Sequence, residues 1–280
     1  METFADYLLN EKDLINKMDI LHRLQRKLRE KRGVNIFFNN TVILKTEIAR
    51  MFLEYTEVGK ELDENLVLTA CLLCNCKKVD GPQSLESLHT YAKNGAEFLS
   101  TLGFDRRFCK ICEEVNRYSG SEPREPESDI LELVDNFGGM LLDRPERAGY
   151  SPEKAIMQMD LETFRNKKNR YFEQFKEFVS MMQEVEVGKV GTVKMKPFYA
   201  LKKVCKDYLT DKLIGGGILK RYQVVVDNAV KNKSKEQKTE VNSEKETAMF
   251  GQEVLEELGI VKDKAGEYVE KKSQEEEILL

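Results

Sequence analysis

Apolar residues recur at helical spacing along most of the first 230 residues, and this pattern limits the chain to a mostly helical fold. The clearest case is the N-terminus, where Tyr7, Leu14, Leu21 and Leu28 stand seven residues apart and form one apolar stripe. We expect this helix to end at Gly33, because glycine tolerates the positive φ of a helix C-cap. Such a stripe usually packs on its own domain, and a dimer seam is the alternative.

The same spacing predicts further helices, separated by polar or glycine-containing segments. The full set of expected helices covers residues 1–31, 41–55, 65–76, 85–102, 106–117, 130–142, 151–159, 161–183, 198–209 and 218–229. Residues 185–195 alternate apolar and polar positions around two glycines, which favours a small β-hairpin. A glycine triplet at 215–217 is expected to separate the last two helices. The sequence therefore predicts an all-α fold with one minor hairpin.

Composition favours a soluble protein with long surface helices, since 41% of the residues are apolar and 34% are charged. The longest apolar run, residues 66–76, is far shorter than the ~20 residues that span a bilayer. No secretory signal is recognisable at the N-terminus. We therefore expect a cytoplasmic protein without a membrane span, whose six cysteines are free thiols.

Charge is distributed unevenly along the chain. Residues 231–280 hold nine Lys or Arg and thirteen Asp or Glu, whereas residues 1–230 balance to zero. The charge-dense end is expected to be an acidic, partly disordered tail with one short amphipathic helix at 250–258. Because no basic field covers a whole domain, we expect no nucleic-acid binding.

Two motifs occur in order in the middle of the chain. The shorter motif spans residues 94–104 and reads NGAEFLSTLGF, and the longer motif follows at residues 132–156 and reads ELVDNFGGMLLDRPERAGYSPEKAI. The longer motif contains, in sequence order, Asp135, Asp143-Arg144-Pro145 with Arg147, and Ser151-Pro152-Glu153 with Ala155. With these motifs, residues 39–178 resemble an HD-GYP domain, in which a helix with a metal-binding Asp precedes D-R-P-x-R and S-P-E-x-A segments.

The resemblance implies an HD-domain-like helical bundle, here with an extra N-terminal helix and a small C-terminal helical region. The expected parts are an N-terminal helix (1–35), a degenerate HD-GYP-like domain (36–184), a C-terminal helical region (185–232) and an acidic tail (233–280). The resemblance also implies imidazole and carboxylate ligands that converge on metal ions, and these ions activate a water for phosphodiester hydrolysis.

The metal ligands of the family are largely missing from the matching positions. Where the namesake His-Asp pair should stand, the chain has Cys74 and Asn75, and of the following segment only Lys78 is retained. Tyr91 occupies the place of the next His, and residues 114–116 contain no imidazole where paired histidines are expected. His22 and His89 are the only histidines of the chain, so a hydrolase built on histidine clusters is excluded.

A relict pocket without catalytic residues, metal or cofactor is therefore expected. Its predicted lining is Cys74, Asn75, Lys78, Tyr91, Glu114, Asn116 and Asp135. One retained carboxylate cannot hold a metal cluster, which needs several ligands. Arg144 and Arg147 are predicted nearby, where they either contact phosphate or, as we favour, stabilise the turn by binding Asp143 or a helix end.

Two C-x-x-C pairs leave a second interpretation open. Cys71 and Cys74 form the first pair, and Cys109 and Cys112 form the other. Such pairs occur in zinc and redox sites, but both lie in apolar helical segments, where cysteine is an ordinary small core residue. The core interpretation is the one we favour.

The residues that match the framework of the family are retained, whereas its metal ligands are lost. Together these observations predict a pseudoenzyme. We expect a bacterial cytoplasmic signalling protein that acts as a binding, scaffolding or regulatory module. Its partner is expected to be another protein or a second copy of the chain, with a nucleotide in the metal-free pocket as a further ligand. The alternative is a divergent metal-dependent phosphohydrolase or cyclic di-nucleotide phosphodiesterase, with a metal site rebuilt from Cys74, Glu114 and Asp135.

Overall fold

Helices make up most of the described structure. The computed structural model describes residues 3–33, 40–78, 85–117, 122–144, 147–161, 169–210, 212–236, 260–262 and 268–270. These ranges contain eleven α-helices, so the predicted all-α class is confirmed, whereas the HD-domain arrangement stays a prediction. No helix in the described ranges is long and apolar enough to cross a membrane. The chain divides into two compact units, Met1–Val179 and Ser180–Leu280.

The N-terminal stripe forms two helices, and the expectation of a single helix was wrong. α1 (Phe4–Asn10) begins at a capping box formed by Thr3. α2 (Leu14–Arg32) begins at Asp13, whose carboxylate accepts the backbone N–H groups of the first turn. α1 buries Ala5 and Leu8 and leaves Tyr7 53% exposed, so the predicted stripe is buried only from Leu14 onwards. α2 ends at Gly33, whose φ of 62° makes it the predicted C-cap.

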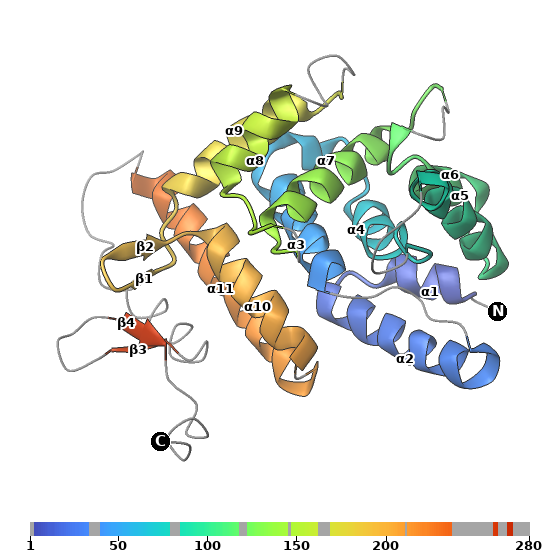
Figure 1. Cartoon of the computed structure of the whole chain (residues 1–280), viewed down its shortest axis with the longest axis horizontal. Coiled ribbons are helices and arrows are strands. Elements are labelled where there is room, and N and C mark those ends of the chain that lie inside the picture. The colour runs from blue at the N-terminus through green and yellow to red at the C-terminus, as the bar shows by residue number, and fades with distance from the viewer. Residues whose placement is uncertain are drawn as a thin grey trace. The chain divides into compact units, whose positions relative to one another are not determined.

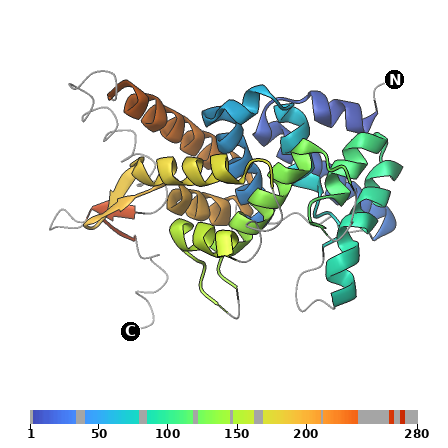
Figure 2. The ribbon, with the colours of Figure 1, turned by 90° about the horizontal axis from the view of Figure 1, so that it is seen from above.

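Three helices form the centre of the first unit: α3 (Asn40–Tyr55), α4 (Glu64–Leu73) and α7 (Pro126–Leu141). They pack on one another, with α7 (green) lying against α3 (blue) in Figures 1 and 2. Pro126 occupies the first turn of α7, where its fixed φ suits a helix start. The helix therefore begins four residues before the predicted position.

The rest of this unit surrounds that centre. Its further elements are the 3-10 turn η1 (Glu57–Lys60), the helices α5 (Leu85–Thr101), α6 (Arg106–Glu113) and α8 (Pro152–Met159), and the part of α9 (Phe172–Glu184) up to Val179. The helix predicted over 161–183 begins only at Phe172 in the described residues, because Asn169 folds back to accept the backbone N–H of Tyr171. Phe175 and Phe178 of α9 pack on Phe52 of α3, with ring centroids 5.2 and 5.4 Å away.

The second unit contains the predicted hairpin and a pair of helices. β1 (Gly188–Val190) pairs antiparallel with β2 (Val193–Met195), as expected. α10 (Pro197–Thr210) and α11 (Lys212–Glu236) then lie side by side (Figure 1). The glycine triplet lies inside α11 and does not separate two helices, so that expectation was wrong. Packing of α11 on α10 outweighs the low helix propensity of glycine.

The predicted tail contains two short strands. β3 (Ile260–Lys262) pairs antiparallel with β4 (Tyr268–Glu270), and β4 lies beside β1 within the second unit. The amphipathic helix expected at 250–258 falls outside the described residues.

A lysine is fully buried where the N-terminal helices meet α4. The ammonium of Lys17 donates to the backbone oxygen of Leu8 (2.9 Å) and to Thr69 Oγ1 (3.1 Å). Burial lowers the pKa of Lys17 to about 8, against the opposing attraction of Glu11 and Asp63. The amine therefore titrates more than two pH units below a lysine in water, near pH 10.4.

This burial predicts a pH dependence of stability. Between pH 8 and about 10.4 the folded protein has released the Lys17 proton and the unfolded chain still holds it, so the free energy of unfolding rises with pH. Relative to Lys17→Met, the wild type should gain roughly 2–3 kcal/mol between pH 7 and pH 10. Urea unfolding of both proteins across this range measures the difference between their free energies of unfolding. The buried thiols are present in both proteins, so the effect of their titration cancels from this difference. Parallel pH curves would contradict the assignment.

Candidate functional site

Asp135 of α7 is bound by two donors from neighbouring helices. Its Oδ1 accepts from the ammonium of Lys45 on α3 and from Nδ2 of Asn75, 2.7 Å away, directly after α4. Lys45 is 4% exposed and Asn75 is 1% exposed. Burying a carboxylate and an ammonium costs desolvation energy, which close pairing and extra hydrogen bonds offset. Asp135 therefore has an ammonium of the protein as its counter-ion.

Gly138 allows Lys45 to reach Asp135. A Cβ added at Gly138 would stand 2.7 Å from Lys45 Cγ and 3.0 Å from Leu44 Cδ2, which is closer than packed atoms approach. The aliphatic part of Lys45 thus lies directly over Gly138, and the ammonium reaches the carboxylate nearly one turn earlier on α7. A side chain at this position would displace the aliphatic part of Lys45 from its place over α7.

Lys78 approaches the same carboxylate from a more open side. Its Nζ lies 3.8 Å from Asp135 Oδ2 and 5.1 Å from the ring centroid of Tyr91, and its side chain is 27% exposed. The thiol of Cys74 is buried within the field of Asp135 and Lys45. Five of the seven predicted lining residues therefore gather here: Cys74, Asn75, Lys78, Tyr91 and Asp135.

Electrostatics keep Asp135 ionised. Burial acts to raise the pKa of Asp135, but the charges of Lys45 and Lys78 and the hydrogen bond from Asn75 outweigh it and hold the pKa well below its usual range. Burial lowers the pKa of Lys45, and the charge of Asp135 opposes that shift. With two ammoniums against one carboxylate, the site carries an excess of positive charge.

Glu114 and Asn116 make their contacts in a second polar cluster, at the junction of α6 and α7. Glu114 is fully buried and accepts from Ser128 Oγ (2.8 Å) and from the backbone N–H of Glu125 (2.9 Å). The backbone oxygen of Asn116 accepts from Arg124 (3.3 Å). These contacts hold the segment that leads into α7, so the predicted pocket is divided between two places.

Arginines neutralise the buried acids of this second cluster. Arg124 pairs with Asp129 (3.0 Å), Arg117 pairs with Glu132 (2.9 Å), and Arg170 lies 3.5 Å from Asp129. The two acid side chains are 4% and 3% exposed, and a buried carboxylate needs such partners. The cluster therefore stabilises the start of α7, the helix that carries the site.

Arg144 and Arg147 bind the opposite end of α7. Arg147 donates to the backbone oxygens of Gly139 (3.2 Å) and Met140 (3.1 Å), and Arg144 donates to Gly139 (3.4 Å). Cations at a helix C-terminus satisfy its last carbonyls and oppose its dipole. This is the turn-stabilising arrangement favoured from the sequence.

All six cysteines are free thiols, as predicted, and Cys109 is the only one that is not buried. Burial raises the pKa of Cys76 to about 12 and that of Cys71 and Cys112 well above the usual range. Protonated thiols are poor nucleophiles and poor metal ligands. Across the described ranges, no three His, Cys, Asp or Glu side chains are grouped so that they could hold a metal ion.

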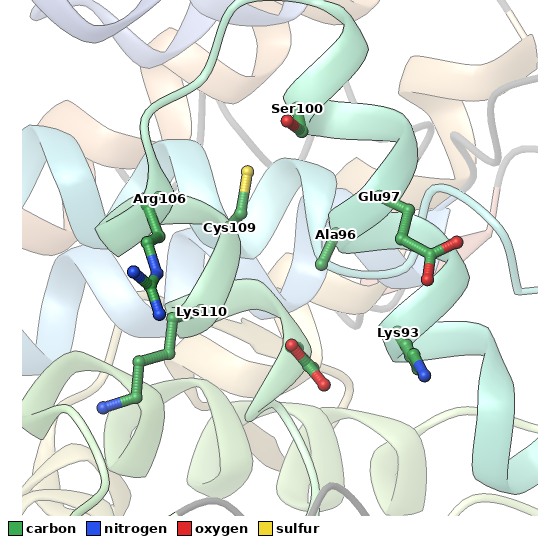
Figure 3. A pocket seen from close by; sticks show the side chains of 8 residues that line it. Lys93, Ala96, Glu97, Ser100, Arg106, Cys109 and Lys110 are labelled. Carbon is green, nitrogen blue, oxygen red and sulfur yellow. The ribbon is translucent and has the colours of Figure 1, made fainter.

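A groove of about 430 Å³ lies between α5 and α6 (Figure 3). Its lining residues are Lys93, Ala96, Glu97, Ser100, Arg106, Cys109, Lys110 and Glu113. In Figure 3, Arg106 and Lys110 extend from α6, while Glu97 and Lys93 lie on α5. Burial and the charge of Asp105 raise the pKa of Cys109, so this thiol is not an activated nucleophile. With charges of both signs on its walls, the groove selects no single class of ligand.

The residues around Asp135 do not fit a catalytic metal cluster. Metal ions bind the lone pairs of carboxylates and imidazoles. The neighbours of Asp135 instead present N–H donors, from Lys45, Lys78 and the amide nitrogen of Asn75. The two histidines of the chain lie on α2 and α5.

Comparison of the chain with family models, curated proteins and solved structures finds no match. The likeness to HD-GYP domains therefore rests on the motifs of residues 94–104 and 132–156. The side-chain contacts of Asp135 are observed in the structure and do not depend on that likeness.

Lys45 is the functional residue that sequence analysis missed. Its signal is a single lysine inside an otherwise apolar helical face, between Leu44 and Ile48. A charge in such a position is rarely buried without a partner. The periodicity could have marked Lys45 as a buried ion, but only the packing of α3 on α7 identifies Asp135 as its counter-ion.

Variants that break the ion pair between Lys45 and Asp135 should reveal the energetic coupling between the two charges. Lys45→Met and Asp135→Leu each leave a buried charge without its main partner, so each should lower the free energy of unfolding by about 3–5 kcal/mol. The double variant removes both charges and should lose about 2 kcal/mol less than the sum of the single variants. Urea unfolding of the four proteins completes the cycle, and additive losses would show that the ions are independent.

Native thiol titration should find one reactive cysteine per chain. Cys109 is the half-buried thiol, so it should react with an aromatic disulfide reagent, and Cys109→Ser should abolish the native reaction. All six thiols should react after denaturation. Thiols that become reactive only after addition of a chelator would instead indicate a zinc site.

Proposed function

We propose that this chain is a catalytically inactive HD-GYP-like protein that acts as a binding, scaffolding or regulatory module. One observation carries the proposal: the ammonium of Lys45 is the counter-ion of Asp135. The resemblance assigns that carboxylate to a metal ion, and here a fixed positive side chain of the protein neutralises it. The framework of the family is retained while the groups that perform its chemistry are replaced.

Electrostatic repulsion supports this interpretation. A divalent ion at Asp135 would lie close to the ammoniums of Lys45 and Lys78. Two unit charges 4 Å apart repel by about 4 kcal/mol at an effective dielectric constant near 20, and a divalent ion doubles that figure for each lysine. Metal binding would therefore require Lys45 to leave a buried position between α3 and α7.

The charge of the site suits an anionic ligand without metal, such as a nucleotide. The ammonium of Lys78 is partly exposed, and the site has more positive than negative charge. Protein association through helices is the other mode of binding that we propose, with another protein or a second copy as partner.

The purified protein should contain no stoichiometric metal. Elemental analysis after incubation with Mn²⁺ or Fe²⁺ should give the same result for wild type, Asp135→Ala and a surface control, Glu97→Gln, because Lys45 already neutralises the carboxylate. Hydrolysis of a cyclic di-nucleotide should not exceed the buffer rate. About one equivalent of metal that is lost only in Asp135→Ala would establish the alternative, a divergent phosphohydrolase with a rebuilt site.

A further inference from the structure

Lys17 joins three helices of the first unit through a single amine. It lies near the start of α2, and its Nζ donates to the backbone oxygen of Leu8 in α1 (2.9 Å) and to Thr69 Oγ1 in α4 (3.1 Å). The Leu8 oxygen is one of the last four carbonyls of α1, which lack a partner within their own helix. Thr69 donates its hydroxyl hydrogen to the backbone oxygen of Asn65 (2.6 Å), so its oxygen is available as an acceptor. The amine therefore connects both N-terminal helices to α4.

These two hydrogen bonds match a neutral amine better than an ammonium. A neutral amine has two N–H donors, whereas an ammonium has three. Among the described residues, Leu8 and Thr69 provide the acceptors of Lys17, and its side chain is fully buried. Protonation therefore adds a buried charge and a third donor that no acceptor of the described residues receives. Both changes cost free energy.

The carboxylates around Lys17 compensate this charge only from a distance. Glu11, between α1 and α2, and Asp63 and Glu64, at the start of α4, attract the ammonium. None of the three forms an ion pair with Lys17 in the part of the chain that the structure describes. Burial outweighs their attraction and lowers the pKa of Lys17 to about 8, whereas a lysine in water titrates near pH 10.4. The docked helices therefore bind this proton less tightly than released helices would.

The described contacts of the N-terminal helices with the rest of the unit are few. Both helices pack on α4 (Figure 1), and the ring of Phe4 meets that of Phe104 edge to face, with 6.3 Å between the centroids. Thr3 lies beside Gly103, where an added Cβ would stand 3.5 Å from the Thr3 Cβ. Terminal elements with few tertiary contacts open at a lower free energy than the core. Local release of residues 3–33, with α3 and α7 still packed, is therefore the favoured opening of this unit.

We propose that α1 and α2 form a pH-dependent latch on α4, which closes as Lys17 loses its proton and opens as Lys17 takes one up. Release of residues 3–33 places Lys17 in water, where the amine holds its proton more tightly than in the docked state. The docked state therefore gains stability relative to the released state as the pH rises from 8 towards 10.4. Opening uncovers a face of α4, the helix that leads into Asn75 beside Asp135.

Hydrogen exchange of the intact protein, followed by mass spectrometry, tests this proposal. The opening constant of a peptide is its exchange rate divided by the intrinsic rate at the same pH, under conditions where closing is faster than exchange. For α1 and the first half of α2 this constant should fall about tenfold between pH 7 and pH 9 in the wild type. It should also exceed the opening constant of α7 at both pH values, because the release is local.

Two variants separate Lys17 from other titrating groups. Lys17→Met removes the amine and keeps an unbranched side chain, so the opening constant of its N-terminal helices should not fall in this range. Lys27→Met, at an exposed position of α2, is the matched control and should behave like the wild type. The α-amino group titrates in the same range, but it is present in all three proteins, so the comparison removes its effect.

Three results would overturn the proposal. The first is a fall of the same size in Lys17→Met, because another group would then be responsible. The second is an equal opening constant for α1 and α7, because the helices would then be released only by global unfolding. The third is a constant value in the wild type between pH 7 and pH 9, which decides the question even if Lys17→Met does not fold.

Discussion

The ion pair between Lys45 and Asp135 is the interaction on which the centre of the first unit depends. It joins α3 to α7 inside a core of apolar side chains, where neither charge is tolerated without the other. Gly138 provides the space for the lysine, and Asn75 adds a second hydrogen bond to the carboxylate. The carboxylate that the proposed resemblance assigns to a metal ion is thereby neutralised by the protein's own side chain.

The other charged groups of the first unit serve the same helix. The arginines around Asp129 and Glu132 stabilise its start, and Arg144 and Arg147 bind the carbonyls at its end. α7 is therefore held by ion pairs at its start and middle and by hydrogen bonds from arginines at its end. Such a helix presents Asp135 in one position, and the partly exposed Lys78 is the group beside it that remains accessible to an anionic ligand.

Sequence periodicity was sufficient for the helical class, the hairpin at 185–195 and the C-cap at Gly33, because each depends on local spacing or on one backbone conformation. It failed where a local signal and tertiary packing disagree. Asp13 restarts a helix that the apolar stripe continues, and the glycine triplet 215–217 is helical because α11 packs on α10.

At the site, Asn75 and Lys78 both contact Asp135, whereas Glu114 makes its hydrogen bonds with Ser128 and a backbone N–H. Glu114 is drawn away by Ser128 and by a backbone N–H, which are contacts that no linear motif records. Lys45 was missed because its partner is ninety residues away in the sequence. Long-range ion pairs of this kind are specified by packing and not by spacing.

A crystal structure of the protein grown with excess Mn²⁺ tests the central claim most directly, since anomalous scattering locates the metal. The account predicts the ammonium of Lys45 within hydrogen-bonding distance of Asp135 and no anomalous peak at that carboxylate. An anomalous peak coordinated by Asp135, with Lys45 turned away, would contradict it.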